Sequence, residues 1–337
     1  MSGRTVIVVT STWDLHSDVV ISRLRERGAD VVRINTEDVP RSTVLDVAFG
    51  DGEQGAEVLL RHEDREVDLA RVRSVWTRPA GEWTFSENLQ LWERAFAAAE
   101  AAHVVNRLWE SLDCFWMSRP SAIEAASWKG EQLRRARRMG FAVPRTTITT
   151  DPLAVQRFRA DSRGPIVTTA LSGATRSTAS GWADPMRTTA LANGTATTVT
   201  EDLLRPDDRR PPVPCLLQEI VAKRAELNVT IVGDEVFAAE IHVEENRAAA
   251  GGSPHALPQG PDCSPATLPE SVRARCRDFV HSYGLTFGVL DLLVTPSGEY
   301  VFLENNPVGQ FLHIEERVPA LGITDAVVDC LARNSGG

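Results

Sequence analysis

Short hydrophobic runs alternate with an amphipathic stretch at the start of the chain. Residues 5–10 form a continuous apolar run of the kind that a strand buried on both faces shows. Residues 17–27 have helical spacing and end at Gly28, and residues 30–34 are apolar again. This order predicts a βαβ unit, and residues 72–79 predict a further strand that ends in a loop. The first part of the chain is therefore expected to be an α/β domain.

The pattern then changes to helices and to a small mixed module. An alanine-rich stretch at residues 89–102 and an apolar stretch at residues 109–116 predict a helical hairpin. A longer helix is expected from about residue 123 to residue 139, where Gly140 ends it. An α+β module follows, with strands expected at residues 165–171 and 214–221.

Two β-hairpins are predicted in the last third of the chain. Residues 228–241 alternate around the turn Gly233-Asp234. Residues 289–306 form two apolar, alternating runs that flank a Pro-Ser-Gly turn at residues 296–298.

Three polar side chains interrupt the second hairpin. Glu304 and Asn306 leave one strand on the same face, and Asp291 on the partner strand joins them if the register allows. Two carboxylates and an amide oxygen on an apolar sheet are costly to bury without a counter-charge. Mg²⁺ prefers such oxygen ligands and is usually held by one or two carboxylates together with nucleotide phosphates. The pattern favours a metal site, and the alternative is a hairpin whose polar face meets water.

Composition narrows the class of protein. The chain has 337 residues, of which 42% are hydrophobic and 24% charged, so it can bury a large core divided over two or three subdomains. No apolar run is long enough to span a bilayer, and the N-terminus does not have the pattern of a signal peptide, so a cytoplasmic protein is expected. The net charge of −10 argues against broad nucleic-acid binding. Five scattered cysteines without a C-x-x-C pair indicate neither a disulfide framework nor a zinc site.

Other kinds of site find little support. The turn at residues 11–18 lacks the glycines of a dinucleotide-binding motif. Asp14, His16 and Asp18 within this turn could bind a metal, but a helix-capping cluster is favoured because Ser17 and Asp18 suit the first positions of a helix. No Ser-His-Asp or Cys-His motif occurs in a recognisable context.

The second hairpin also carries a resemblance to a known family. Asp291 followed by Glu304-x-Asn306 resembles the metal-binding end of the ATP-grasp carboxylate ligases. The surrounding residues 303–315 are similar to the LExNPxGQ…IE block of the graspetide (microviridin-type) ribosomal peptide maturases, which form side-chain ester or amide crosslinks in a precursor peptide.

The resemblance extends through the middle of the chain. The family pattern K…QL…A…G…VP is matched by Lys129, Gln132, Leu133, Ala136, Gly140, Val143 and Pro144. By resemblance, Lys129 contacts the ATP phosphates, whereas the residue type alone is equally compatible with a surface lysine. Residues 72–79 resemble the family's VWxRRP segment, with Thr77 in place of its first arginine and Arg78 retained.

The nucleotide site that the resemblance implies lies between the last two parts of the chain. Residues 218–227 resemble the family's QExVxKRxEL segment, in which the backbone of residues 219–221 would bind the adenine edge and Glu226 the ribose hydroxyls. The candidate nucleotide-binding residues are Lys129, Thr169, Ser172, Gly173, Arg176, Gln218, Glu219, Ile220, Val221, Lys223 and Glu226. The loop at residues 172–178 can fold over phosphates, with an ordinary solvent loop as the alternative.

Two departures from the family pattern concern the phosphates and the peptide. Thr169 stands where ATP-grasp enzymes usually carry a second phosphate-binding lysine, so weaker ATP binding is expected unless Arg176 supplies the charge. The DWR-like stretch that commonly follows the residue 228–241 hairpin is missing, which leaves Arg247 as the local arginine. Arg78 and Arg247 are the candidate catalytic residues, expected to face acidic side chains of the peptide.

The resemblance implies a three-part ATP-grasp fold of mixed α/β and α+β class. Its parts would be an N-terminal α/β domain (1–118), a small central module (119–220) and a C-terminal metal-binding module (221–337). With ATP and Mg²⁺, the enzyme would activate Asp or Glu side chains of a ribosomal precursor peptide, leader plus core, as acyl phosphates. Ser or Thr hydroxyls or Lys amines would then attack, and the enzyme would be a homodimer. The loops at residues 172–178 and 248–265 are expected to be mobile and to close over the site.

Two other functions remain open from the sequence. An ATP-grasp ligase that joins small molecules or amino acids, or that modifies a peptide in some other way, would account for the missing DWR-like stretch. A catalytically impaired, peptide-binding relative would account for Thr169.

Overall fold

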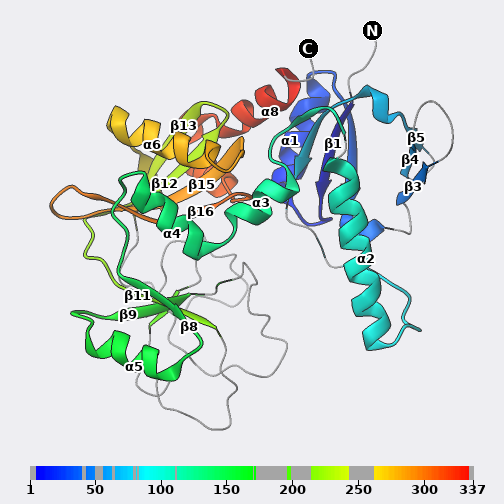
Figure 1. The fold of residues 1–337 in the computed structure, drawn as a ribbon. Helices are drawn as coiled ribbons and strands as arrows, with labels where there is room; N and C mark the ends of the chain where they lie inside the picture. Colours follow the sequence, from blue (N-terminus) through cyan, green and yellow to red (C-terminus); the bar gives the residue numbers. More distant parts are fainter. Residues whose placement is uncertain are drawn as a thin grey trace, which may run out of the picture.

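The computed structural model describes most of the chain, and Figure 1 shows its fold. The described residues are 5–39, 43–49, 56–62, 65–78, 81, 83–110, 112–169, 171, 196–198, 214–242 and 262–333. They form a mixed α/β fold with four separate sheets.

The N-terminal part contains the predicted βαβ unit. Its parallel sheet has the order β2-β1-β6-β7, formed by β1 (Thr5–Thr10), β2 (Asp30–Asn35), β6 (Val72–Thr77) and β7 (Phe115–Trp116). Two helices, α1 (Leu15–Glu26) and α2 (Leu91–Glu110), and two 3₁₀ turns, η1 (Thr36–Asp38) and η2 (Leu69–Arg71), belong to this part. A separate antiparallel sheet consists of β3 (Thr43–Phe49), β4 (Ala56–His62) and β5 (Arg65–Val67).

Two helix predictions in the middle of the chain are wrong in detail. The apolar stretch at residues 109–116 is not the second helix of a hairpin, because Phe115 and Trp116 form β7 and pair with Ser74 and Val75. Aromatic side chains suit a strand, and this pairing satisfies their backbone groups.

The helix expected over residues 123–139 is two helices, α3 (Pro120–Ala126) and α4 (Lys129–Arg138). Trp128 between them has an extended backbone, with φ of −82° and ψ of 104°. The Ser127 hydroxyl donates to the Ile123 carbonyl at 2.7 Å, a side-chain bond to the backbone of the preceding turn where the first helix ends.

The small sheet in the middle of the chain has its own core. It has the order β10-β9-β11-β8, formed by β8 (Thr146–Thr149), β9 (Ile166–Thr169), β10 (Ala196–Thr198) and β11 (Cys215–Glu219). Helix α5 (Pro152–Ala160) is capped by Asp151, whose carboxylate accepts from the Leu153 amide at 2.8 Å. Phe158, Ile166 and Leu217 pack together at the centre of this unit.

The largest sheet contains both predicted hairpins. Its five antiparallel strands lie in the order β14-β13-β12-β15-β16. They are β12 (Ala225–Val232), β13 (Glu235–His242), β14 (Asp262–Pro265), β15 (Phe287–Val294) and β16 (Tyr300–Asn306). The accompanying helices are α6 (Glu270–His281), α7 (Leu312–Arg317), the 3₁₀ turn η5 (Pro319–Leu321) and α8 (Ile323–Arg333).

The two faces of this sheet pack against different partners. Leu227, Val229, Ile231 and Phe302 share one core with Phe279 of α6. Ala136 and Phe141 belong to the same core, so α4 packs on this sheet. On the other face, Val232 and Ala239 share a core with Ile314 of α7 and Val327 of α8.

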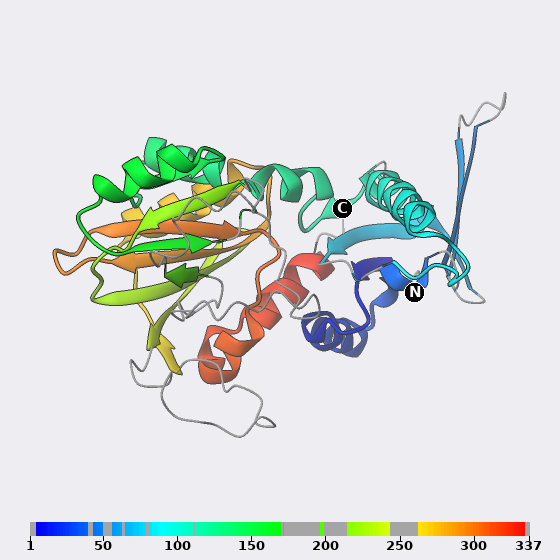
Figure 2. The same ribbon diagram turned by 90° about the horizontal axis from the view of Figure 1, so that it is seen from below.

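The helices on the second face join this sheet to the N-terminal part. Val6 and Leu24 share a single core with Phe287, Phe311 and Val327. Figures 1 and 2 show α8 lying between the large sheet and α1. At the surface of this junction, Arg27 forms ion pairs with Asp325, at 3.1 Å, and with Asp329.

Candidate active site

The candidate metal-binding residues lie where a bulge changes the alternation of β16. Asp291 is directly opposite Glu304, whereas Leu292 is opposite Phe302, so Leu303 is an extra residue without a register partner. The bulge allows Phe302 to enter the core with α6 while Glu304, two residues later, lies beside Asp291 on the other face. The structure therefore places Asp291 and Glu304 together, and the register places Asn306 opposite Val289, two residues from Asp291.

Lys129 lies at the same place. Its Nζ is 2.7 Å from Glu304 Oε2, and both side chains are largely buried, with exposed fractions of 20% and 28%. The candidate phosphate-binding lysine and the candidate metal ligand, 175 positions apart in the numbering, thus form an ion pair.

Gln132 fixes the helix that carries Lys129. Its side chain is 2% exposed and bonds to both backbone groups of Asn305: Nε2 donates to the carbonyl at 2.8 Å, and Oε1 accepts from the amide at 2.9 Å. Nε2 also donates to the Ala126 carbonyl at 2.5 Å. Gln132 thereby ties α4 to β16, one residue from Glu304. The sequence pattern named Gln132 but assigned it no role.

Two buried acceptors on β12 face the same region. Asn228 is opposite Asp291 in the register and donates from Nδ2 to Asp291 Oδ1 at 3.2 Å, while its own Oδ1 is buried without a partner among the described residues. Glu226, two residues earlier, pairs through Oε1 with Lys223, and its Oε2 is likewise buried and unpaired in the described structure. Asn228 was missed by the sequence analysis, and its alternation with Glu226 is the signal that could have found it.

Two backbone amides of the segment that was expected to bind adenine already have partners within the protein. The amide of Glu219 donates to the Arg145 carbonyl at 3.0 Å, and the amide of Ile220 donates to the Pro165 carbonyl at 2.9 Å. These two N–H groups are therefore used within the protein, so donors to adenine would have to come from other backbone groups of residues 219–221. The Glu219 carboxylate pairs with Arg145 at 2.9 Å, and Gln218 donates to the Thr146 hydroxyl at 3.0 Å.

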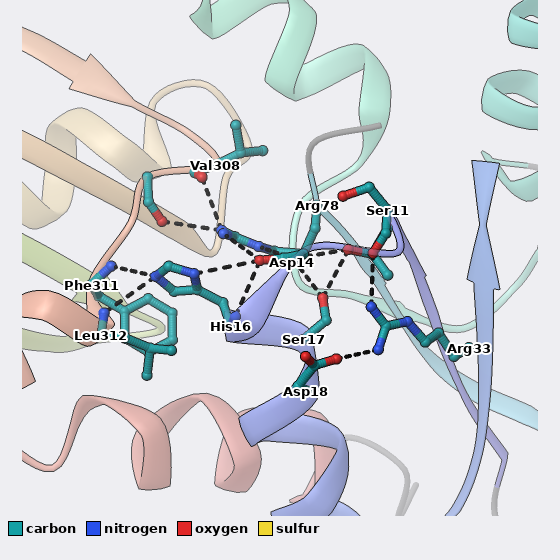
Figure 3. A network of polar contacts seen from close by, with 12 residues as sticks. Ser11, Asp14, His16, Ser17, Asp18, Arg33, Arg78, Val308, Phe311 and Leu312 are labelled. Carbon is teal, nitrogen blue, oxygen red and sulfur yellow. Dashed lines mark hydrogen bonds and ion pairs between the residues drawn. The ribbon is translucent and has the colours of Figure 1, made fainter. Parts of the chain in front are cut away.

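Arg78 occupies a different environment from the one expected. It is 4% exposed and lies between Asp14 and the loop after β16, where it donates to the carbonyls of Val308 and Gly309 (Figure 3). Its guanidinium is thus engaged within the protein, and a direct contact with acidic peptide side chains has no support here. Asp14 is the N-cap of α1 and accepts from the His16 amide at 3.2 Å, as the capping interpretation predicted.

Several candidate residues cannot be placed. Ser172, Gly173, Arg176 and Arg247 lie outside the described residues, as does the loop at residues 172–178. Of the loop expected at residues 248–265, residues 248–261 are also outside them, and residues 262–265 form the strand β14 instead of a loop. Thr169 is the last residue of β9, opposite Leu216 and Ala196.

Solved structures of known proteins resemble this chain over nearly its whole length. The MvdD pre-ATP grasp domain family matches residues 5–124. The macrocyclase MdnC of Microcystis aeruginosa MRC, solved with its precursor peptide MdnA, is 25% identical, with a TM-score of 0.79 over 98% of this chain and 99% of that chain. The macrocyclase MdnB of the same organism is 27% identical, with a TM-score of 0.79 over 97% and 99% of the two chains.

The chain is an ATP-grasp ligase, similar over nearly its whole length to macrocyclases of ribosomal peptides. A ribosomal-peptide-associated ATP-grasp ligase of Chryseobacterium gregarium, solved with ADP and a leader and core peptide, has the same fold, with a TM-score of 0.79 and 24% identity over 98% of this chain and 97% of that chain. No curated protein matches the sequence of this ligase. No helix among its described residues is long and apolar enough to cross a membrane.

The residues present fit a nucleotide with a hard cation. Among the described residues there is no group of three or more His, Cys, Asp or Glu that could hold a metal, so the candidate site consists of two carboxylates and an amide. Asp291 and Glu304 supply the carboxylate oxygens that Mg²⁺ prefers, and Lys129 adds a positive charge for phosphate. The unpaired oxygens of Glu226 and Asn228 are acceptors that a ligand hydroxyl or a bound water would satisfy.

Proposed function

We propose that this ligase uses ATP and Mg²⁺ to activate Asp or Glu side chains of a ribosomal precursor peptide as acyl phosphates, which Ser or Thr hydroxyls or Lys amines of the same peptide then attack. The observation that carries the proposal is the ion pair between Lys129 and Glu304, which lies beside Asp291 on the large sheet. The similarity to macrocyclases over nearly the whole chain supports the substrate class.

Each residue has a role that its chemistry allows. ATP with Mg²⁺ supplies the phosphoryl group and neutralises its charge, so the protein mainly has to position the reactants. Asp291, Glu304 and Asn306 would hold the metal, and Lys129 would bind phosphate oxygens. Glu226 would accept from the ribose hydroxyls, because its Oε2 is buried and unpaired in the described structure. Val221 is left as the backbone donor to adenine, because the Glu219 and Ile220 amides already donate within the sheet.

The other candidate residues would contribute further contacts to the nucleotide and the peptide. Lys223 would orient Glu226, with which it forms an ion pair. Gln218 would support the end of β11, and Thr169 would lie near the phosphates at the end of β9. The loop with Ser172, Gly173 and Arg176 would cover the phosphates, and Arg247 would face acidic side chains of the peptide.

The chain would be organised in three parts, as the sequence indicates: residues 1–118, 119–220 and 221–337, the last carrying the metal site. The separate core of the small sheet supports its treatment as a module. Helices α3 and α4 would act with the third part, on which they pack. All five cysteines are free, which is consistent with the reducing cytoplasm as the place of the reaction.

A homodimer is the final element of the proposal. Helix α2 presents Leu91, Trp92 and Phe96 to solvent, with exposed fractions of 86%, 67% and 64%. Figure 1 shows this helix projecting away from the N-terminal sheet. Such an apolar surface is typical of an interface between protein chains. Light scattering should show that the parent is a dimer and that Trp92→Glu dissociates it. Trp13→Glu, at an exposed tryptophan outside α2, should leave the dimer intact. A monomeric parent would contradict the proposal.

The metal assignment is tested by Glu304→Ala, with Glu299→Ala as a matched control at an exposed position of the same hairpin. Incubation with ATP, Mg²⁺ and the precursor peptide should yield ADP and, by mass spectrometry, a loss of one water per crosslink. Glu304→Ala should abolish both products, while Glu299→Ala should retain them. Turnover by Glu304→Ala at the parent rate would show that the assignment is wrong.

A further inference from the structure

A buried network of charged and titratable side chains joins the N-terminal part to the metal-binding end of β16 (Figure 3). Asp14 and His16 lie at the start of α1, and Arg78 follows β6. The exposed fractions of His16 and Arg78 are 8% and 4%, and that of the Asp14 side chain is 9%. Groups of this kind are rarely buried unless they are paired, so their arrangement needs an explanation.

Arg78 connects a carboxylate to the loop after β16. Its Nε donates to Asp14 Oδ2 at 3.0 Å, and Nη1 donates to the carbonyls of Val308 at 2.9 Å and Gly309 at 3.1 Å. Although burial opposes ionisation of Asp14, the hydrogen bond from His16 and the charge of Arg78 hold the pKa of this carboxyl well below its usual range. The planar guanidinium serves these three acceptors from two separate nitrogens held in a fixed geometry, whereas a lysine has a single nitrogen.

His16 caps a helix from outside it. The helix α7 begins after Phe311, and the first amides of a helix have no acceptor within it. His16 Nε2 accepts from the Phe311 amide at 3.0 Å and from the Leu312 amide at 3.2 Å. Its Nδ1 lies 3.4 Å from Asp14 Oδ1, so the ring is neutral with its proton on Nδ1. The imidazole also packs edge-on against the Phe311 ring, with 4.9 Å between centroids.

The segment held in this way begins at a proposed metal ligand. Asn306 Oδ1 accepts from the Val308 amide at 3.1 Å. Gly309 packs so closely on β15 that a Cβ there would lie 2.5 Å from Val289 Cγ2, and Val289 is opposite Asn306 in the register. The path of residues 306–312, and with it the position of the Asn306 side chain, is therefore determined by contacts with both the large sheet and the N-terminal part.

We propose that Asp14, His16 and Arg78 are positioning residues of the metal site: they hold residues 308–312 so that Asn306 and the end of β16 keep the geometry that binds Mg²⁺ with nucleotide. The inference rests on the proposed metal role of Asp291, Glu304 and Asn306 and adds to it a dependence on the N-terminal part. Arg78 thus serves the reaction through the loop that it holds.

The hydrogen bonds that His16 accepts should be lost as the pH falls. Burial lowers the pKa of His16, so the folded protein binds this proton less readily than the unfolded chain. A depressed folded pKa contributes stability above the unfolded value of about 6.5, and that contribution is lost as the pH falls. The groups that face the imidazole are Asp14, Arg78, His313 and Glu316. Protonation of His16 removes the acceptor of two α7 amides, so the metal site should weaken in acid.

The test compares His16→Ala, His16→Gln and Arg78→Lys with the parent, and uses His281→Ala as a control at an exposed histidine of α6. Two quantities are measured: hydrogen exchange in peptides covering residues 306–316, and ADP affinity by calorimetry with Mg²⁺ or with a chelator. His16→Ala and Arg78→Lys should speed exchange and weaken Mg²⁺-ADP binding about tenfold, with less than a twofold change for ADP in chelator. His16→Gln keeps a side-chain acceptor and should restore most of the affinity.

The outcomes separate this inference from the proposed function. Affinity for Mg²⁺-ADP that is the same in His16→Ala as in His281→Ala, while Glu304→Ala loses it, would overturn the positioning role and leave the metal site intact. The positioning role would also be overturned if ADP affinity weakened equally with and without Mg²⁺, or if His16→Gln failed to restore it. A general loss of structure would weaken binding in both conditions and in both His16 variants. Parent-like Mg²⁺-ADP binding by Glu304→Ala would instead overturn the proposed metal site itself.

Discussion

Replacing Gln132 by alanine should loosen β16 next to the metal site. The change removes three hydrogen bonds, one to Ala126 and two to the backbone of Asn305, all buried. A neutral hydrogen bond contributes about 1 kcal/mol to stability, and a buried group left without a partner costs more, so the local loss should be about 3 kcal/mol. At 1.4 kcal/mol per factor of ten, the Asn305 amide should exchange its hydrogen about 100-fold faster.

Hydrogen exchange followed by mass spectrometry measures this change in a peptide that covers β16. Gln156→Ala, at an exposed position of α5, removes the same side chain without a buried partner and should leave exchange in β16 as in the parent. Because α4 also carries Lys129, the KM for ATP should rise in Gln132→Ala. If β16 exchanges at the same rate in the two variants, Gln132 does not hold the strand and the argument from its contacts is wrong.

Three further changes test other parts of the structure. Gly309→Ala should lower the free energy of unfolding by about 1–3 kcal/mol through a clash with Val289. Adding Val289→Ala to the same chain should restore part of this loss, and chemical unfolding of the single and double variants measures the two values. Thr169→Lys should tighten ATP binding by about 1.5–3 kcal/mol in calorimetry, and no gain would mean that the end of β9 does not point at the phosphates. Burial raises the pKa of the Cys276 thiol to about 12, so this cysteine should resist a thiol reagent at pH 8 in the folded protein, and rapid labelling would contradict its buried position.

The sequence was a good guide wherever periodicity and turn chemistry act locally. The strand at residues 5–10, the turn at Gly233 and the hairpin with Asp291 and Glu304 agree with the structure because alternation and glycine turns depend on neighbouring residues. The apolar residues 109–116 were assigned to a helix because a short hydrophobic run has no decisive period. Pairing of Phe115 and Trp116 with β6, about 40 residues away, decided the outcome.

The features that the sequence did not reveal depend on contacts between distant segments. The local pattern does not predict the bulge at Leu303, because Phe302, Glu304 and Asn306 have the spacing of residues on one face of a regular strand. The sequence marked Arg78 as a functional residue, but its burial between Asp14 and the residue 308–309 carbonyls follows from the packing of two parts of the chain. The proposed roles of the metal and nucleotide residues remain predictions.

The shared core of the N-terminal part and α8 has a consequence for synthesis of the protein. Val6 and Val8 of the first strand pack in one cluster with Val327 and Leu331 of the last helix. A ribosome releases the chain from its N-terminus, so β1 and α1 emerge long before the side chains that complete their core. During that interval their apolar surface has no permanent cover, and burial is complete only after residues 323–333 have left the ribosome. The N-terminal part should therefore depend on chaperones or on transient contacts while the rest of the chain is made, and a premature stop before α8 should leave it prone to aggregation.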